Sequence, residues 1–139
     1  MRPADRGCGI RADVRCVNAK QPLVLVADDD PDIRQLVRLR LERSGYVVVS
    51  ASDGAEALEL ASSCNPDLAI LDVAMPSLSG LEVTRALRER MITFPVILLT
   101  ARARESDVRE GGAAGADAYI TKPFSPQELE LRVRDLAHV

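Results

Sequence analysis

The most informative segment of this chain is Asp67-Leu68-Ala69-Ile70-Leu71-Asp72-Val73-Ala74-Met75-Pro76. Its apolar run of four residues leads to a single acid, and a Met-Pro turn follows. A short apolar run between turn signals predicts a strand that is buried on both faces. Asp72 then lies at the carboxyl end of that strand, where open parallel sheets bind ligands. A buried carboxylate needs a partner or a metal, so this segment alone leaves Asp72 evenly balanced between a turn residue and a functional site.

The composition of the chain is that of one globular domain. Its 139 residues are enough for a hydrophobic core, and its net charge of -3 gives no reason to expect direct nucleic-acid binding. No apolar run approaches the length of a membrane span. The cysteines Cys8, Cys16 and Cys64 form no C-x-x-C pair, which predicts free thiols and a cytoplasmic location. Residues 1–21 lack periodicity, so we expect a flexible N-terminal extension followed by one domain at 22–139.

Short apolar runs alternate with amphipathic patterns along the rest of the chain. The expected strands are 23–27, 46–50, the run that ends at Asp72, 96–99 with Thr100 at its end, and 118–121. The expected helices begin after Asp30, after Ser52 or Asp53, at Leu81, at about Glu105 and at Ser125. Two of the inward-facing stripes are Ile33, Leu36, Val37 and Leu41 in the first helix and Leu81, Thr84, Leu87 and Met91 in the third. This order predicts an α/β fold with a doubly wound five-stranded parallel sheet and five helices, a flavodoxin-like three-layer sandwich.

Polar residues with complementary chemistry end four of these strands. Asp28 and Asp29 follow the first strand, and Asp72, Thr100 and Lys122 end the third, fourth and fifth strands. The carboxyl ends of parallel strands meet at one edge, so these side chains should lie in one crevice. Clustered carboxylates repel one another unless a cation neutralises them, and hard oxygen ligands suit Mg²⁺, with Mn²⁺ as an alternative. An aspartate beside a metal and a lysine can accept a phosphoryl group as an acyl phosphate.

Each of these residues also has a purely structural explanation. The acids at 28–30 could cap a helix and complement its dipole, and Lys122 could be a solvated lysine before a turn. Thr100 could be an ordinary strand terminus. Three acids in a row exceed what capping requires, however, and the joint spacing favours a site.

Residues 24–139 resemble the receiver domain of bacterial response regulators in two-component signalling. The resemblance rests on four motifs: Leu-Val-Ala-Asp-Asp-Asp-Pro-Asp-Ile-Arg, Leu-Asp-Val-Ala-Met-Pro-Ser-Leu-Ser-Gly-Leu-Glu, Ile-Leu-Leu-Thr-Ala-Arg and Ala-Gly-Ala-Asp-Ala-Tyr-Ile-Thr-Lys-Pro-Phe. It implies a signalling phosphoacceptor rather than an enzyme, with a sensor histidine kinase as phosphoryl donor. The implied roles are phosphoacceptor for Asp72, Mg²⁺ ligation for Asp28, Asp29, Asp72 and the Ala74 carbonyl, phosphoryl contact for Thr100 and Lys122, and a switch aromatic at Tyr119. The fourth helix, fifth strand and fifth helix would form the signalling face.

Some positions depart from the patterns of the family. Ala74 and Arg102 occupy the two positions that tune phosphoryl lifetime, and Ala74 has no side chain to position a water, which predicts slow hydrolysis. Ala118 stands where the winged-helix class often has an acid, so we expect a monomer or a weak dimer. The output partner is unknown, or the output domain is missing from this chain. The alternative is a degenerate receiver that acts as a phosphorylation-independent interaction module.

Overall fold

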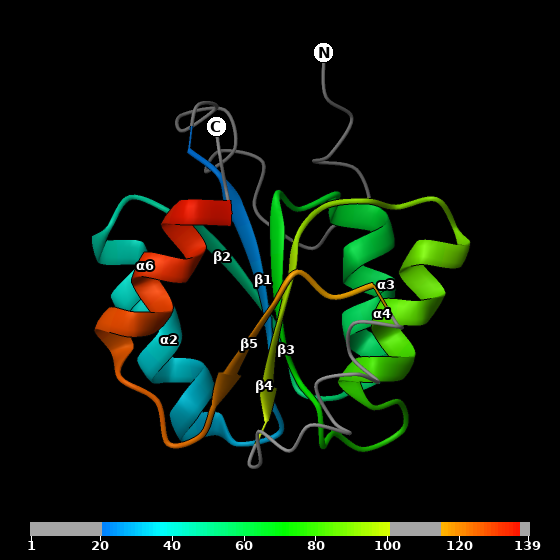
Figure 1. Ribbon diagram of the computed structural model, residues 1–139, viewed down its shortest axis with the longest axis horizontal. Coiled ribbons are helices and arrows are strands. Elements are labelled where there is room, and N and C mark those ends of the chain that lie inside the picture. The colour runs from blue at the N-terminus through cyan, green and yellow to red at the C-terminus, as the bar shows by residue number, and fades with distance from the viewer. Residues whose placement is uncertain (1–20, 101–114, 137–139) are drawn as a thin grey trace.

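The computed structural model describes residues 21–100 and 115–136 as an α/β sandwich around a parallel sheet. The sheet has the order β2-β1-β3-β4-β5, in which all neighbouring strands run parallel (Figure 1). The strands are β1 (Leu23–Ala27), β2 (Val47–Ala51), β3 (Leu68–Asp72), β4 (Val96–Thr100) and β5 (Ala118–Thr121). The predicted fold class is therefore confirmed, and only β2 is displaced, by one residue, from its predicted position.

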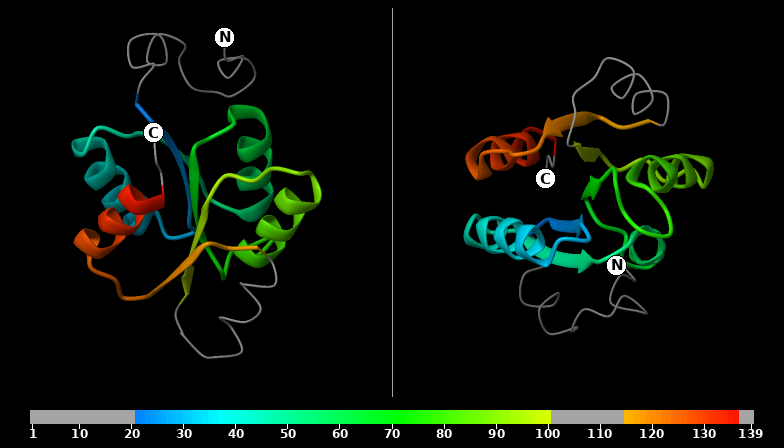
Figure 2. Two further views of the ribbon diagram at one scale, coloured as in Figure 1. Left: turned by 45° about the horizontal axis from the view of Figure 1, so that its top comes forward. Right: turned by 90° about the horizontal axis from the view of Figure 1, so that it is seen from below.

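Two pairs of helices cover the two faces of the sheet. The helices α2 (Pro31–Arg43) and α6 (Pro126–Leu136) lie on one face, and α3 (Gly54–Cys64) and α4 (Gly80–Glu89) lie on the other. The end-on view in Figure 2 shows the sheet between these two layers. The helix expected from about Glu105 to Ala114 lies outside the described residues, as do residues 1–20 of the expected extension.

The side chains of the central strands alternate between the two helix layers. Leu25, Leu71 and Leu98 pack with α3 and α4, whereas residues such as Val26 and Ile70 pack with α2 and α6. All residues of β1, β3 and β4 are buried. The prediction of strands without a polar face is thus confirmed for the middle of the sheet, as expected when helices cover both sides.

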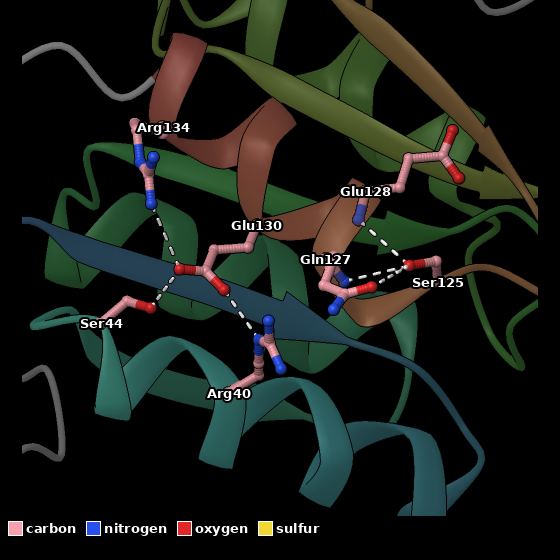
Figure 3. Close-up of polar contacts among 7 residues, drawn as sticks. All are labelled: Arg40, Ser44, Ser125, Gln127, Glu128, Glu130 and Arg134. Atoms are coloured by element: carbon pink, nitrogen blue, oxygen red, sulfur yellow. Dashed lines mark hydrogen bonds and ion pairs between the residues drawn. The ribbon is translucent and has the colours of Figure 1, made fainter.

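Local capping chemistry sets where the helices begin. Asp30 and Asp53 are the N-caps of α2 and α3, and each carboxylate accepts a hydrogen bond from a backbone N–H of the first turn. Ser79 and Glu82 form a complete capping box at α4. The hydroxyl of Ser125 accepts hydrogen bonds from two backbone N–H groups at the start of α6, while the Glu128 carboxylate points away from it (Figure 3).

The side chain of Glu130 links α6 to α2. Its carboxylate accepts hydrogen bonds from Arg40 Nε at 2.7 Å, from the Ser44 hydroxyl and from Arg134 Nη2 at 3.4 Å (Figure 3). Hydrogen bonds from Ser44 and Arg40 hold the pKa of Glu130 below its ordinary value. The two helices on this face are therefore joined by charge as well as by their apolar contacts.

Three expectations about single side chains are wrong. Leu36 is 47% exposed, and Met91 is 83% exposed in a left-handed conformation because α4 has already ended at Glu89. Cys64 is buried and forms a disulfide, so it is not the free thiol expected there.

Among the described residues, no helix is both long and apolar enough to cross a lipid bilayer.

Candidate functional site

Four strand ends bring the predicted polar residues to one edge of the sheet. Asp28 follows β1 and is fully buried, and Asp72 is the last residue of β3, with 4% of its surface exposed. Thr100 is the buried last residue of β4, and Lys122 directly follows β5. The arrowheads of β4 and β5 at the lower end of the sheet in Figure 1 mark this edge, and β1 and β3 run parallel to them. The expected convergence of these strand ends is therefore observed.

Lys122 is shared between two buried carboxylates. Its Nζ lies 2.9 Å from Asp28 Oδ2 and 3.2 Å from Asp72 Oδ2. The second oxygen of Asp28 accepts a hydrogen bond from the Asp30 N–H at 2.9 Å, and that of Asp72 accepts a longer one from Ala74 at 3.3 Å. A single ammonium thus compensates two buried negative charges, which leaves the site with an excess of negative charge.

This excess appears in the protonation equilibria of the site. Burial, and then the negative charge of Asp28, raise the pKa of Asp72 from 3.8 to about 6, although Lys122 opposes the increase. Burial alone would lower the pKa of Lys122, but its contacts with Asp28 and Asp72 leave that pKa above its ordinary value. Lys122 therefore stays charged, and Asp72 is an aspartate that is costly to ionise without a further cation.

The geometry of the acids fits a divalent cation. One carboxylate oxygen each from Asp28, Asp29 and Asp72 can be chosen so that all three lie within 4.8 Å of one another. Asp29 is exposed, whereas Asp28 and Asp72 are buried, so the cluster opens to solvent on one side. A small set of carboxylates open to water matches the preference of Mg²⁺ for oxygen ligands and retained waters.

Thr100 and Tyr119 lie on the same side of the sheet. Side chains alternate along a strand, so Thr100 points to the same face as Leu98, two residues earlier in β4. Tyr119 pairs in register with Leu98 and packs with it in the core beneath α3 and α4. Burial raises the pKa of the Tyr119 phenol. The two residues predicted to act together thus lie on the same face of adjacent strands, two residues apart in register.

Comparison with known proteins identifies the family. The family model of the response regulator receiver domain matches residues 24–134. This chain belongs to the response regulator receiver family. It is 50% identical over 111 residues to the alkaline phosphatase synthesis transcriptional regulatory protein PhoP of Bacillus subtilis, and 46% identical over 113 residues to the transcriptional regulatory protein ResD of the same organism. These matches cover 80% and 81% of the chain but only 46% and 47% of the relatives, so the chain spans about half of their length.

Solved receiver structures agree with this assignment. The receiver domain of the Francisella response regulator 1452 has a TM-score of 0.81 and 42% identity, with 84% of this chain and 97% of that chain covered. The chemotaxis protein CheY4 of Vibrio cholerae has a TM-score of 0.79 and 36% identity, with 84% and 98% covered. The predicted family and fold are therefore confirmed.

The loop after Asp72 in this receiver domain returns close to the strand end at Gly80, where a larger residue would clash. A Cβ atom on Gly80 would lie 2.5 Å from the backbone oxygen of Asp72, and the Gly80 N–H donates to the Val73 carbonyl at 3.1 Å. Ala74 is exposed in this loop, and its N–H contacts Asp72. Arg102, the other residue expected to tune phosphoryl lifetime, lies outside the described residues.

Sequence reasoning missed one side chain next to the acids. Arg34 Nη1 in α2 donates a hydrogen bond to the backbone oxygen of Asp28 at 2.7 Å. Arg34 belongs to the first motif of the resemblance, but its residue type and spacing do not reveal a contact with a backbone carbonyl.

Proposed function

We propose that this receiver domain, placed at residues 22–139, accepts a phosphoryl group onto Asp72 from the phosphohistidine of a sensor histidine kinase, in a reaction that requires Mg²⁺. The observation that supports this most directly is the sharing of Lys122 by the buried acids Asp28 and Asp72, with Asp29 close by at the solvent edge. Such a site has a nucleophile, one fixed cation and room for a second.

In the proposed reaction, an ionised Asp72 oxygen attacks the phosphorus of the phosphohistidine. The new O–P bond forms an acyl phosphate, and the P–N bond breaks with its electron pair remaining on the imidazole nitrogen. With a pKa of about 6, Asp72 is mostly ionised at neutral pH. In this proposal Lys122 would attract the phosphoryl oxygens, and the Thr100 hydroxyl would donate a hydrogen bond to one of them.

Asp28, Asp29, Asp72 and the backbone carbonyl of Ala74 would hold the metal. Bound Mg²⁺, or Mn²⁺ in its place, would neutralise charge on the transferred group. The excess of negative charge around Asp72 gives a physical reason for the metal requirement, since removal of divalent ions leaves two acids competing for one lysine.

The acyl phosphate would act on the signalling face through Thr100 and Tyr119. New acceptor oxygens at Asp72 can draw the Thr100 hydroxyl inward, and a change at Thr100 alters the space beside Tyr119 on β5. We assign the output to a face that includes β5 and α6, which would control a partner or an output domain. Because Ala74 offers no side chain to an attacking water, we expect slow loss of the phosphoryl group, and a half-life of seconds would contradict this.

The decisive experiment is incubation of the protein with acetyl phosphate and Mg²⁺, followed by intact mass measurement. Wild type should gain one phosphoryl group, and Asp72→Asn should gain none. Asp135→Asn removes an exposed carboxylate on α6 and serves as the control that should still be phosphorylated. Omission of Mg²⁺ in the presence of EDTA should abolish the adduct. A folded wild type without an adduct would instead favour a degenerate receiver that binds partners without phosphorylation.

A further inference from the structure

The carbonyl group of Asp28 has an unusual partner. β1 ends at Ala27, so this carbonyl lies just beyond the strand that pairs with β2 and β3. Asp28 is fully buried, and a buried backbone oxygen requires a hydrogen bond. Arg34, one turn into α2, supplies that bond through Nη1 at 2.7 Å. A charged side chain is thus used to hold a single peptide group beside the acidic cluster.

That peptide group joins two of the three clustered acids. Asp28 is also fixed through its N–H, which donates to the Ala51 oxygen at 3.2 Å, and through its two carboxylate oxygens. Asp29 differs, because its exposed carboxylate makes no hydrogen bond or ion pair with any residue of 21–100 or 115–136. The direction of the Asp29 side chain therefore depends on the backbone, and the peptide before it is the one held by Arg34.

We propose that Arg34 is a positioning residue for the divalent-cation site: its hydrogen bond to the Asp28 carbonyl holds the Asp28–Asp29 peptide so that Asp29 stays within reach of Asp28 and Asp72. This inference rests on the proposed function, since it concerns the same cation. Arg34 acts through the backbone and does not itself ligate the metal, because a guanidinium has no acceptor.

Two effects of Arg34 on Mg²⁺ affinity have opposite signs. Its positive charge repels a cation, so an arginine that acted only through charge would, when removed, leave a site that binds Mg²⁺ more tightly. An arginine that positions Asp29 would, when removed, leave a site that binds more weakly. Loss of a partner that orients a metal ligand commonly costs about 10–100-fold in affinity. We expect the positioning effect to dominate and Arg34→Ala to weaken Mg²⁺ binding about tenfold, at the lower end of that range.

The test is a Mg²⁺ titration of the full chain, followed by amide chemical shifts of the loops around the site. Arg34→Ala should show the weaker affinity, and Arg34→Lys, which keeps a charge and a donor, should fall between it and wild type. Arg38→Ala is the matched control, because Arg38 lies one turn further along α2 and only pairs with Glu42 at the surface. Its affinity should equal that of wild type.

The outcomes separate this inference from the proposed function. Unchanged or tighter Mg²⁺ binding by Arg34→Ala would overturn the positioning role, even if that variant unfolds more easily in EDTA. Should Arg34→Ala fail to fold, Arg34→Lys decides the matter, and wild-type affinity in a folded Arg34→Lys protein would count against the inference. Absence of Mg²⁺ binding by wild type would refute both, whereas wild-type binding with unaffected variants refutes only the role of Arg34.

Discussion

Replacement of Asp72 by asparagine should stabilise the metal-free protein at pH 8. The carboxyl group is buried, and burial together with the charge of Asp28 raises its pKa from 3.8 to about 6. Each unit by which the folded pKa exceeds the unfolded pKa corresponds to ~1.4 kcal/mol of unfolding free energy. Ionisation of Asp72 therefore costs the folded state about 3 kcal/mol at pH 8. Asparagine has a similar shape and no charge, and we expect it to recover about 2–3 kcal/mol.

The effect must depend on pH in a defined direction. Because the folded pKa is the higher one, the protonated carboxyl favours the folded state, and this contribution is fully present only below about pH 4. It is lost as the pH rises through about 6. The free energy of unfolding of Asp72→Asn should therefore exceed that of wild type most at pH 8, and the difference should disappear near pH 4.

Urea unfolding followed by far-UV circular dichroism measures these differences, since the chain has no tryptophan. Wild type, Asp72→Asn and the exposed control Asp135→Asn are compared in EDTA at several pH values. Added Mg²⁺ should then stabilise wild type more than Asp72→Asn, because a ligand stabilises the state that it binds. A variant that is no more stable than wild type at pH 8, or a gain that is equal at every pH, would refute the reasoning.

Three further substitutions test one close backbone approach beside Asp72 and two polar contacts elsewhere in the fold. Gly80→Ala places a Cβ atom 2.5 Å from the Asp72 carbonyl oxygen, so we expect a loss of about 2–3 kcal/mol in urea unfolding and slower phosphorylation; unchanged stability would contradict this. Arg88→Ala leaves the Gly115 carbonyl, which accepts at 2.8 Å, without its partner, and should cost about 2 kcal/mol in the same assay. Glu130→Gln should lower stability at pH 7 but not at acid pH, because the lowered pKa of this carboxyl gives a stability that is lost as the pH falls through it; an equal loss at both would exclude a role of its charge.

The edge of the sheet could be predicted because its signals are local and strong. A buried apolar run that ends in an acid fixes both a strand and the position of that acid, as for Asp72. Parallel strands share one carboxyl edge, so the meeting of Asp28, Asp72 and Lys122 follows from the strand assignment alone. The distances between them depend on packing and do not follow from the sequence.

The rotational phase of the helices was harder to predict. Leu36 and Met91 both satisfy an i, i+3 or i+4 spacing. However, Leu36 is half-exposed on α2, and α4 ends at Glu89, before it reaches Met91. A helical stripe predicted from sequence is wider than the face that the sheet can cover. Residues at the border of the stripe can therefore be either buried or exposed. The contact of Arg34 was missed for a different reason, since every residue has a carbonyl and no side-chain pattern marks which one is accepting.

The contacts of Lys122 offer a route by which the proposed phosphorylation of Asp72 would affect the rest of the domain. Lys122 follows β5 directly, and its N–H donates to the Thr100 oxygen at 2.7 Å, so the residue that balances Asp72 is also tied to the end of β4. A phosphoryl group on Asp72 would compete with Asp28 for the Lys122 ammonium, because its oxygens are strong acceptors. Any shift of Lys122 toward that group acts on the strand that carries Tyr119. We therefore expect that the first structural change after phosphorylation of Asp72 is loss of the ion pair between Lys122 and Asp28, and that this change then affects β5.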